Sequence, residues 1–328
     1  MNGSVERRVV ADCVVGAGLA GLWIGHALND QGAEYLIFDK GRTPGGRMAT
    51  RRFEGGLFDH GLPVLEDGHL TERLAALGTT AGLLEEVDLP SGSGWIAREG
   101  LSSLGKHLAR DLRTEMSARV GEARREGDSV ILPVGPEGEA GVEPFEVEVT
   151  GRLFVTAPLP QAQEIAGRLF GKALTSLANP YSPCLVGLVV LESEADLPGG
   201  PLVRSLVDRP PAGFEALVLE FLKFPDREPG VSLRADPGES ARLFDAGEAE
   251  QVAFFRGGFD ELGLEPGPER LQVKKWRYSK PAAGLAESHL RTKVGGVEVF
   301  VAGDSFAAGA GTAVESALTS AASVIERT

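Results

Sequence analysis

The stretch VVGAGLAGLWIGHALNDQGAEYLIFDK, residues 14–40, places a glycine-rich turn between two apolar segments. Val9 to Val15 is a nearly continuous apolar run, typical of a strand buried on both faces of a parallel sheet. Leu19 to Gln31 has the pattern of an amphipathic helix, and Tyr35 to Phe38 predicts a second strand. Together they predict one βαβ unit with a right-handed crossover.

The turn Gly16-Ala-Gly-Leu-Ala-Gly21 has the spacing GxGxxG of a dinucleotide-binding turn. In such a turn Gly16 permits the tight bend, Gly18 lets a pyrophosphate approach the backbone, and Gly21 lets helix and strand pack closely. The helix N-terminus offers free N–H groups to the phosphates. Asp39, at the end of the second strand, is placed to accept hydrogen bonds from a ribose and to repel the 2′-phosphate of NADP. The alternative is a βαβ turn without a ligand.

Composition and charge exclude several partner classes. The 328 residues include 33 Lys and Arg against 47 Asp and Glu, a net charge of −14, which disfavours nucleic acid and anionic membranes. We expect no membrane span, because no apolar run reaches the roughly 18–20 residues that a span needs. Without an apolar signal core at the N-terminus, we expect a cytoplasmic protein with Cys13 and Cys184 as buried free thiols. The scattered histidines predict no metal site.

The rest of the chain predicts further strands and helices, and the pattern changes in its middle. The expected helices are 101–113, one that begins near 161, 240–262 and one from 312; the expected strands are 130–134, 145–149, 153–158, 184–192, 216–224 and 297–304. Residues 130–149 resemble a hairpin, and the strands between 161 and 272 alternate with Pro/Gly-rich connectors, as in an antiparallel layer.

A second glycine pair identifies the dinucleotide. In GRTPGGRMATRR, residues 41–52, Gly45, Gly46 and Arg47 follow the ribose carboxylate, where a second loop could cover the pyrophosphate. An NAD-dependent dehydrogenase does not need this loop. At these residues the chain resembles the flavin-dependent amine oxidase superfamily. FDKGRTPGGRMATRR (38–52) followed by LFDHG (57–61) is most similar to its renalase-type branch of small FAD oxidoreductases.

The resemblance extends to later segments and implies a set of cofactor contacts. EVFVAGDSF (298–306) is similar to the late flavin motif, in which Asp304 would bind the ribityl chain, and TAVESALTSA (312–321) to the helix whose N-terminus points at the flavin N1–C2=O end. Val120 would meet the adenine through its backbone. The implied FAD-binding residues are Gly16, Ala17, Gly18, Leu19, Ala20, Gly21, Asp39, Lys40, Gly45, Gly46, Arg47, Met48, Gly61, Leu62, Val120, Gly303, Asp304, Thr312, Ala313 and Val314.

The resemblance and the pattern along the chain predict the same α/β architecture. A Rossmann-like FAD-binding domain with a parallel sheet would be interrupted by an α+β substrate domain built on an antiparallel sheet. The expected boundaries are 1–66, 100–160 and 272–328 for the FAD-binding domain, and 67–99 and 161–271 for the substrate domain.

The chain departs from renalase-type proteins near the flavin. The glutamine and the aromatic residue that usually follow the turn are absent from Gly61-Leu-Pro-Val-Leu65, and Ser305 and Ala313 stand where that family has tryptophan and arginine. The late motif contains no cysteine, so FAD would be held without a covalent bond there. These departures leave FAD binding expected and the substrate open.

Catalytic residues are few in this sequence. The candidates are His60, Trp276, Tyr278 and Lys223, with Lys280 as a second candidate for the water-activating lysine of some relatives. For each a structural role is the alternative: a histidine hydrogen-bonded within a turn, an aromatic residue in the core, a solvated lysine. Asp59 is expected as a turn or cap residue, and Glu315 as a residue that compensates a helix dipole.

The expected activity is that of an FAD-dependent oxidoreductase that takes a hydride from a small-molecule donor onto flavin N5. Aromatic residues make up 6% of the chain, which provides thinly for an amine-binding aromatic cage and favours a dihydronicotinamide-type donor over an amine-like one. The partner would be that small molecule, with a nicotinamide nucleotide as one candidate. The alternatives are a desaturase- or isomerase-like enzyme and a redox-inactive flavin-binding protein. The oligomeric state is open.

Overall fold

The computed structural model describes residues 6–89, 92–138, 142–178, 181–191, 203–205, 211–264 and 270–325. The chain divides into two compact units, which we call unit 1 and unit 2. Unit 1 consists of Met1–Gly46, Gly105–Pro180 and Pro281–Thr328; unit 2 consists of Arg47–Leu104 and Tyr181–Lys280. Each unit is therefore assembled from segments that are far apart in the sequence.

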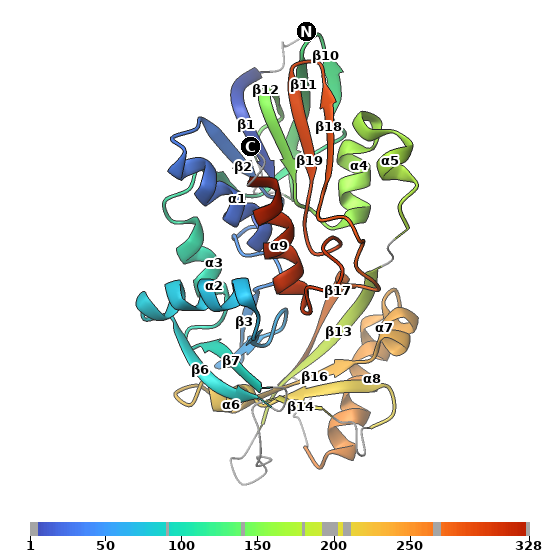
Figure 1. Cartoon of the computed structure of the whole chain (residues 1–328). Coiled ribbons are helices and arrows are strands. Elements are labelled where there is room, and N and C mark those ends of the chain that lie inside the picture. The colour runs from blue at the N-terminus through green and yellow to red at the C-terminus, as the bar shows by residue number, and fades with distance from the viewer. Residues whose placement is uncertain are drawn as a thin grey trace. The chain divides into compact units, whose positions relative to one another are not determined.

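Strand β1 (Glu6–Val15) lies inside the large sheet of unit 1. It pairs in parallel with β2 (Tyr35–Phe38) on one side and β12 (Phe145–Val155) on the other. β19 (Val297–Val301) pairs in parallel with β12, and β8 (Thr114–Glu115) with β2. The antiparallel pairs of this sheet involve β9 (Ala118–Val120), β10 (Arg124–Glu126), β11 (Ser129–Pro136) and β18 (Leu290–Val294). Because β1, β2, β12 and β19 run in parallel, their carboxyl ends meet at one edge (Figure 1).

The helices of unit 1 pack beside this sheet. α1 (Leu19–Asp30) contacts β2 and the final helix α9 (Ala313–Ile325). α4 (Leu159–Phe170) contacts β10, β12 and β18 and is followed by the short α5 (Lys172–Thr175). Apolar side chains of β1 and α1, among them Val14 and Leu22, are fully buried.

Unit 2 is built on an antiparallel sheet in the order β14-β15-β16-β13-β17. Its helices α7 (Pro237–Leu243) and α8 (Glu248–Glu261) bury Leu243, Phe255 and Phe259 in one core cluster with Leu185 and Leu233 of the sheet. The opposite set of β13 side chains, including Cys184 and Val186, packs with Phe58 and Trp276. The five strands are β13 (Tyr181–Val190), β14 (Val203–Ser205), β15 (Phe214–Val218), β16 (Gly230–Ala235) and β17 (Leu271–Pro281).

Two smaller sheets complete unit 2. β3 (Thr50–Phe53) and β4 (Gly56–Asp59) form a hairpin. β5 (Leu65–Glu66), β6 (Leu84–Leu89) and β7 (Gly92–Ala97) form an antiparallel sheet in the order β5-β7-β6. The remaining helices are α2 (His69–Thr80), α6 (Glu220–Lys223) and α3 (Ser102–Ala109), which crosses the boundary between the units at Leu104. The parallel sheet and the separate antiparallel sheets confirm the predicted fold class.

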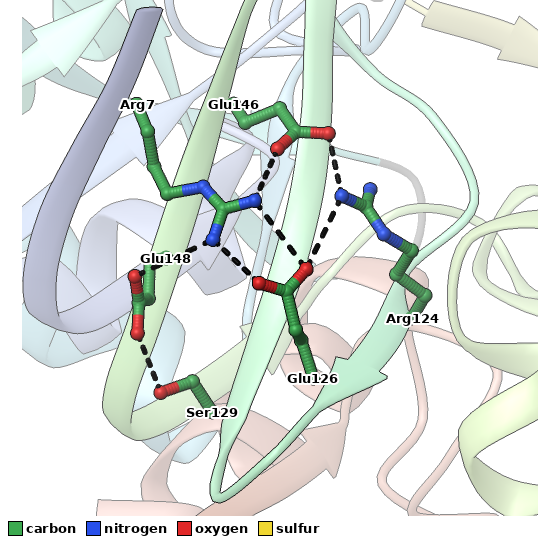
Figure 2. Close-up of polar contacts among 6 residues, drawn as sticks. All are labelled: Arg7, Arg124, Glu126, Ser129, Glu146 and Glu148. Atoms are coloured by element: carbon green, nitrogen blue, oxygen red, sulfur yellow. Dashed lines mark hydrogen bonds and ion pairs between the residues drawn. The ribbon is translucent and has the colours of Figure 1, made fainter.

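An ion-pair network connects strands β1, β10 and β12 of unit 1 (Figure 2). Arg7 of β1 donates to Glu126 at 2.7 Å and to Glu146 at 2.8 Å, and Arg124 donates to the other oxygen of Glu146 at 2.6 Å. These hydrogen bonds lower the pKa of Glu146. Because Arg7, Glu126 and Arg124 are largely exposed, salt screens the network and its contribution to stability is small.

Some predicted elements differ from the observed ones. The helix expected over 240–262 is two helices, since α7 ends at Leu243 and α8 begins only at Glu248, after Gly247. The strand expected over 216–224 ends at Val218, and the charged residues that follow form the short helix α6. In contrast, the expected strands 145–149 and 153–158 belong to one long strand, β12, which ends at Val155. Cys13 and Cys184 are free and buried, as expected.

Candidate functional site

The glycine turn after β1 has the geometry that its sequence predicts. Gly16 has φ +111°, a conformation that favours glycine, and a Cβ on Gly21 would overlap the carbonyl oxygen of Gly16. A Cβ on Gly18 would meet no atom within 4 Å, and its φ of −75° suits any residue. Protein packing therefore requires glycine at 16 and 21, whereas the space beside Gly18 is open.

The second glycine pair lies directly against this turn. Gly45 N–H donates to the carbonyl oxygen of Ala17 at 2.8 Å, and a Cβ on Gly46 would lie 3.2 Å from Gly18 Cα. Both residues have positive φ, +109° at Gly45 and +56° at Gly46. Two glycine clusters about 25 residues apart thus come together in one stretch of backbone, which we call the glycine cradle (residues 16–21 and 45–46).

Asp39 connects the glycine cradle to the loop that follows β2. Its Oδ2 accepts from Ala17 N–H at 2.6 Å and its Oδ1 from Gly41 N–H at 2.6 Å. Strand β9 lies at the same place, because Ala118 N–H donates to the Asp39 carbonyl and Ser117 N–H to that of Gly41. Val120 ends β9 and is buried, and Lys40 is exposed.

Asp304 follows β19 at the same edge of the sheet. Gly303 has φ +141° and donates its N–H to Ser320 Oγ of α9 at 2.9 Å. Asp304 is buried and has interaction partners of its own. Helix α9 begins at Ala313 with Val314 buried, and Thr312 caps it by accepting from Glu315 N–H at 3.1 Å. Its first turn contains one acidic residue, Glu315.

The other predicted cofactor residues belong to unit 2. Arg47 Nη1 donates to the carbonyl oxygen of Ser279 at 2.8 Å, and the Met48 side chain is buried. A Cβ on Gly61 would overlap the Arg47 carbonyl oxygen, so glycine is required there. Leu62 N–H donates to that same carbonyl at 2.8 Å. The chain thus folds back on itself between Arg47 and Leu62.

Lys223 lies in a buried ion-pair cluster that it forms with Asp59 and Glu220. All three side chains are completely buried. The Lys223 ammonium is 2.7 Å from Asp59 Oδ2 and 2.8 Å from Glu220 Oε2, and donates to the Pro63 carbonyl at 2.9 Å. Three oxygen atoms thus lie within 2.9 Å of the buried ammonium nitrogen, so Lys223 is not the solvated lysine that the alternative expected.

The cluster holds two carboxyl groups for one ammonium. Burial raises the pKa of Glu220, and the charge of Asp59 adds to the effect. Burial alone would lower the pKa of Lys223, but Asp59 and Glu220 outweigh it and hold that pKa above its ordinary value. The Ser232 hydroxyl donates to Glu220 at 2.8 Å. The Thr50 hydroxyl donates to Asp59 at 2.6 Å, and the Leu101 N–H at 2.9 Å. Asp59 is thus an ion-pair partner besides holding the start of α3.

His60 stacks on Trp276, with ring centroids 5.3 Å apart and an interplanar angle of 23°. Trp276 Nε1 donates to the His60 carbonyl at 2.9 Å. Burial and the charges of Lys274, Arg234 and Arg51 lower the pKa of His60 to about 4. The ring is neutral at physiological pH, and its Nδ1 is buried without a hydrogen-bond partner among the described residues. It is therefore not held in the turn by a hydrogen bond from Nδ1.

Sequence reasoning did not single out Arg234, although it is central to unit 2. Arg234 donates to the carbonyl oxygens of His60 and Gly61, and its Nη1 lies 3.6 Å from Cys184 Sγ. An arginine inside the apolar strand GVSLRA was the available signal. Tyr278 packs edge-on against Tyr181, whereas Lys280 is exposed and Glu315 is buried.

Comparisons with known proteins support the fold. A model of the NAD(P)-binding Rossmann-like domain matches residues 14–77. A protein from Exiguobacterium sp. 255-15, provisionally named a protoporphyrinogen oxidase, superposes with a TM-score of 0.69 at 14% identity, over 99% of this chain and 100% of that one. A putrescine oxidase bound to putrescine gives 0.64 at 12% identity, over 98% and 100%. The p-nitrophenol 4-monooxygenase PnpA of Pseudomonas putida DLL-E4 gives 0.58 at 16%, over 98% and 79%. At these identities the likeness shows a common fold.

Proposed function

We propose that this protein is an FAD-dependent oxidoreductase of the flavin-dependent amine oxidase type, closest in character to its renalase-type branch. We assign FAD binding mainly to unit 1 and donor binding to unit 2. The donor would be a small molecule of the dihydronicotinamide or amine type, and the protein would act in the cytoplasm. The single observation that carries this proposal is the glycine cradle, in which two separate glycine clusters meet beside a carboxylate.

The residues present fit a dinucleotide. Packing does not require glycine at Gly18, where a side chain would occupy open space, so an approaching ligand is the physical reason for its absence. The first turn of α1 contains no acidic residue, and no side chain caps its N–H groups, which suits a pyrophosphate. Asp39 ends β2, where its carboxylate is suited to a ribose.

The remaining contacts follow the resemblance. In unit 1, Val120, Gly303, Asp304 and residues 312–314 would complete the site; in unit 2, Arg47, Met48, Gly61 and Leu62 would contribute. When bound, the flavin supplies the redox chemistry by accepting a hydride from the donor at N5. The N-terminus of α9 would stabilise negative charge through its N–H groups and dipole.

The buried cluster supports a structural role for Lys223. Three oxygen atoms already lie within 2.9 Å of its ammonium nitrogen, and its raised pKa keeps it protonated at neutral pH. A water-activating base needs a free position for the water and a neutral amine. We therefore propose that Lys223 positions the turn at Pro63, and that hydride removal from the donor needs no protein base.

The visible spectrum of the purified protein tests the cofactor. We expect the absorption bands of bound oxidised flavin and their loss when a suitable donor is added anaerobically. A yellow protein that resists every donor would instead favour the redox-inactive alternative. Flavin that is reduced without oxygen consumption would favour a dehydrogenase or a desaturase. A colourless preparation that binds no added FAD would refute the proposal.

A further inference from the structure

Three cationic side chains surround His60 in unit 2, and we call them the basic cluster: Arg51, Arg234 and Lys274. Arg234 Nη2 is 3.4 Å from the His60 carbonyl oxygen. Lys274 lies two residues before Trp276 on β17, so their side chains leave the same face of the strand. Trp276 in turn stacks on the His60 ring.

Arg51 reaches the same face of β17 from strand β3. Its Nε donates to Gln272 Oε1 at 3.1 Å, and Gln272 lies two residues before Lys274. The basic cluster is thus brought together by contacts of β3, β16 and β17 with the turn at His60. Its charges reach the His60 ring, since all three contribute to lowering the pKa of that residue.

Arg234 is a buried cation without a paired carboxylate. It is 9% exposed, its Nε is buried without a hydrogen-bond partner, and it forms no ion pair among the described residues. It donates hydrogen bonds to two carbonyl oxygens and to the Cys184 thiol. By contrast, Arg152 in unit 1 is paired with the buried Asp12 at 2.6 Å. A buried guanidinium without an anion is costly, which indicates that a partner is missing.

Glu215, an exposed residue of β15, has a carboxylate within electrostatic range of Arg234. Burial raises the pKa of Glu215, although Arg234 and Lys280 act to lower it. Its surroundings thus disfavour the charged carboxylate, and it forms no ion pair with Arg234 among the described residues. Glu215 compensates the buried charge only in part. Lys274 and Arg51 likewise have no ion-pair partner within the described residues, in a chain with a net charge of −14.

We propose that the basic cluster binds one oxyanion group, a carboxylate or a phosphate, of the donor molecule. Its identification as a donor site rests on the proposed function, but binding of the anion itself needs no flavin. The buried Arg234 would supply positive charge, the less buried Lys274 and Arg51 would contact the anion, and the unpaired Nδ1 of the neutral His60 ring would add a hydrogen bond. The preferred donor is then an acidic molecule and not a simple cationic amine.

Calorimetric titration of the full-length protein tests this site. The probes are inorganic phosphate and benzoate, with benzamide and benzylamine as uncharged and cationic controls. We expect saturable binding of one oxyanion, weakened by added sodium chloride, and no binding of either control. Tighter binding of phosphate identifies a phosphorylated donor, whereas tighter binding of benzoate identifies a carboxylic acid. Absence of saturable binding by both anions overturns the proposal.

Matched variants locate the anion. Lys274→Met and Arg51→Gln should each raise the dissociation constant of the preferred anion about tenfold, as expected for loss of a charged contact. Lys275→Met and Arg52→Gln should leave it unchanged, because Lys275 lies over Phe244 at 5.0 Å and Arg52 lies 3.9 Å from Glu99. Equal affinities in Lys274→Met and Lys275→Met overturn the assignment. These pairs avoid Arg234, whose loss could prevent folding.

The flavin content of the same samples separates the two proposals. A protein that binds the oxyanion through Lys274 but is colourless and binds no added FAD supports this site and refutes the proposed function. A yellow protein that fails to bind either anion supports the proposed function and refutes this site.

Discussion

The carboxylate of Asp39 holds the glycine cradle in place through two hydrogen bonds. It joins Ala17 N–H to Gly41 N–H, both at 2.6 Å. We expect Asp39→Ala to weaken FAD binding by about 1–3 kcal/mol, because a charge-assisted hydrogen-bond acceptor is lost. Titration of FAD with fluorescence detection measures the change, and Asp30→Ala, at the exposed end of α1, is the control. Unchanged affinity would remove Asp39 from the site.

Lys223 is the second residue whose loss should be severe. Lys223→Met would leave Asp59 and Glu220 buried together without the ammonium, and breaking such a cluster costs about 3–5 kcal/mol of unfolding free energy. Denaturant unfolding measures this cost. The double variant Lys223→Met with Glu220→Gln should recover part of it, because one buried carboxyl charge is removed as well. A single variant as stable as the wild type would show that the cluster contributes nothing.

The raised pKa of Glu220 predicts a pH dependence with a definite sign. The folded state binds this proton more tightly than the unfolded state, so the stabilisation is complete below the ordinary glutamate pKa and is lost as pH rises through the folded value. The wild type should therefore lose stability relative to Glu220→Gln as pH rises above the ordinary glutamate pKa. The pKa of Glu215 is also raised, but Glu215 is present in the wild type and in the variant, so its effect cancels in the comparison. A stability difference that does not change with pH contradicts the assignment.

At the scale of elements, different glycines of the turn before α1 serve packing and ligand binding, so variants can test the two separately. Gly21→Ala should destabilise the fold, since its Cβ would overlap the Gly16 carbonyl. Gly18→Ala should fold normally, with a melting temperature within about 2 °C of the wild type, yet bind FAD at least about tenfold more weakly. Gly247→Ala is the control, because Gly247 also precedes a helix and has open space around it. Normal FAD affinity in Gly18→Ala would argue against a pyrophosphate at this turn.

Elements with strong local patterns were predictable from the sequence, and those shaped by distant contacts were not. The βαβ unit at 9–38 was predicted because apolar runs and the glycine turn agree over its whole length. The break between α7 and α8 was missed although Gly247 marks it, because apolar residues such as Phe244 continue across it. The turn from β15 into α6 was missed because Glu220 and Lys223 find their partner, Asp59, about 160 residues away.

At the scale of the whole molecule, a ligand bound only by the folded chain stabilises it. FAD at about one hundred times its dissociation constant should add about 2.7 kcal/mol to the free energy of unfolding. Calorimetric melting with and without FAD measures this gain. FMN, which lacks the adenosine half, should give a much smaller gain at equal concentration, because the glycine cradle and Asp39 would have no partner. Equal effects of FAD and FMN would count against the adenosine assignment.

In the candidate site, too, some residues could be predicted from the local sequence, whereas others depend on contacts between distant segments. The glycine cradle and Asp39 were predictable, because glycine spacing and a carboxylate at a strand end are local features. The charge cluster at Lys223 and the burial of Arg234 depend on which strands become neighbours in unit 2, and no spacing rule encodes that. The identity of the donor belongs to this second class.

The two buried cysteines have a practical consequence. Cys13 lies in unit 1 and Cys184 in unit 2, and both thiols are closed off from solvent. Burial also raises the pKa of each thiol, which suppresses the reactive thiolate. Alkylation therefore has to wait until the surrounding structure opens, and peptide mapping of the modified cysteine would identify which half opened first. The alkylation rate of Cys13 thus reports the opening of unit 1, and that of Cys184 the opening of unit 2.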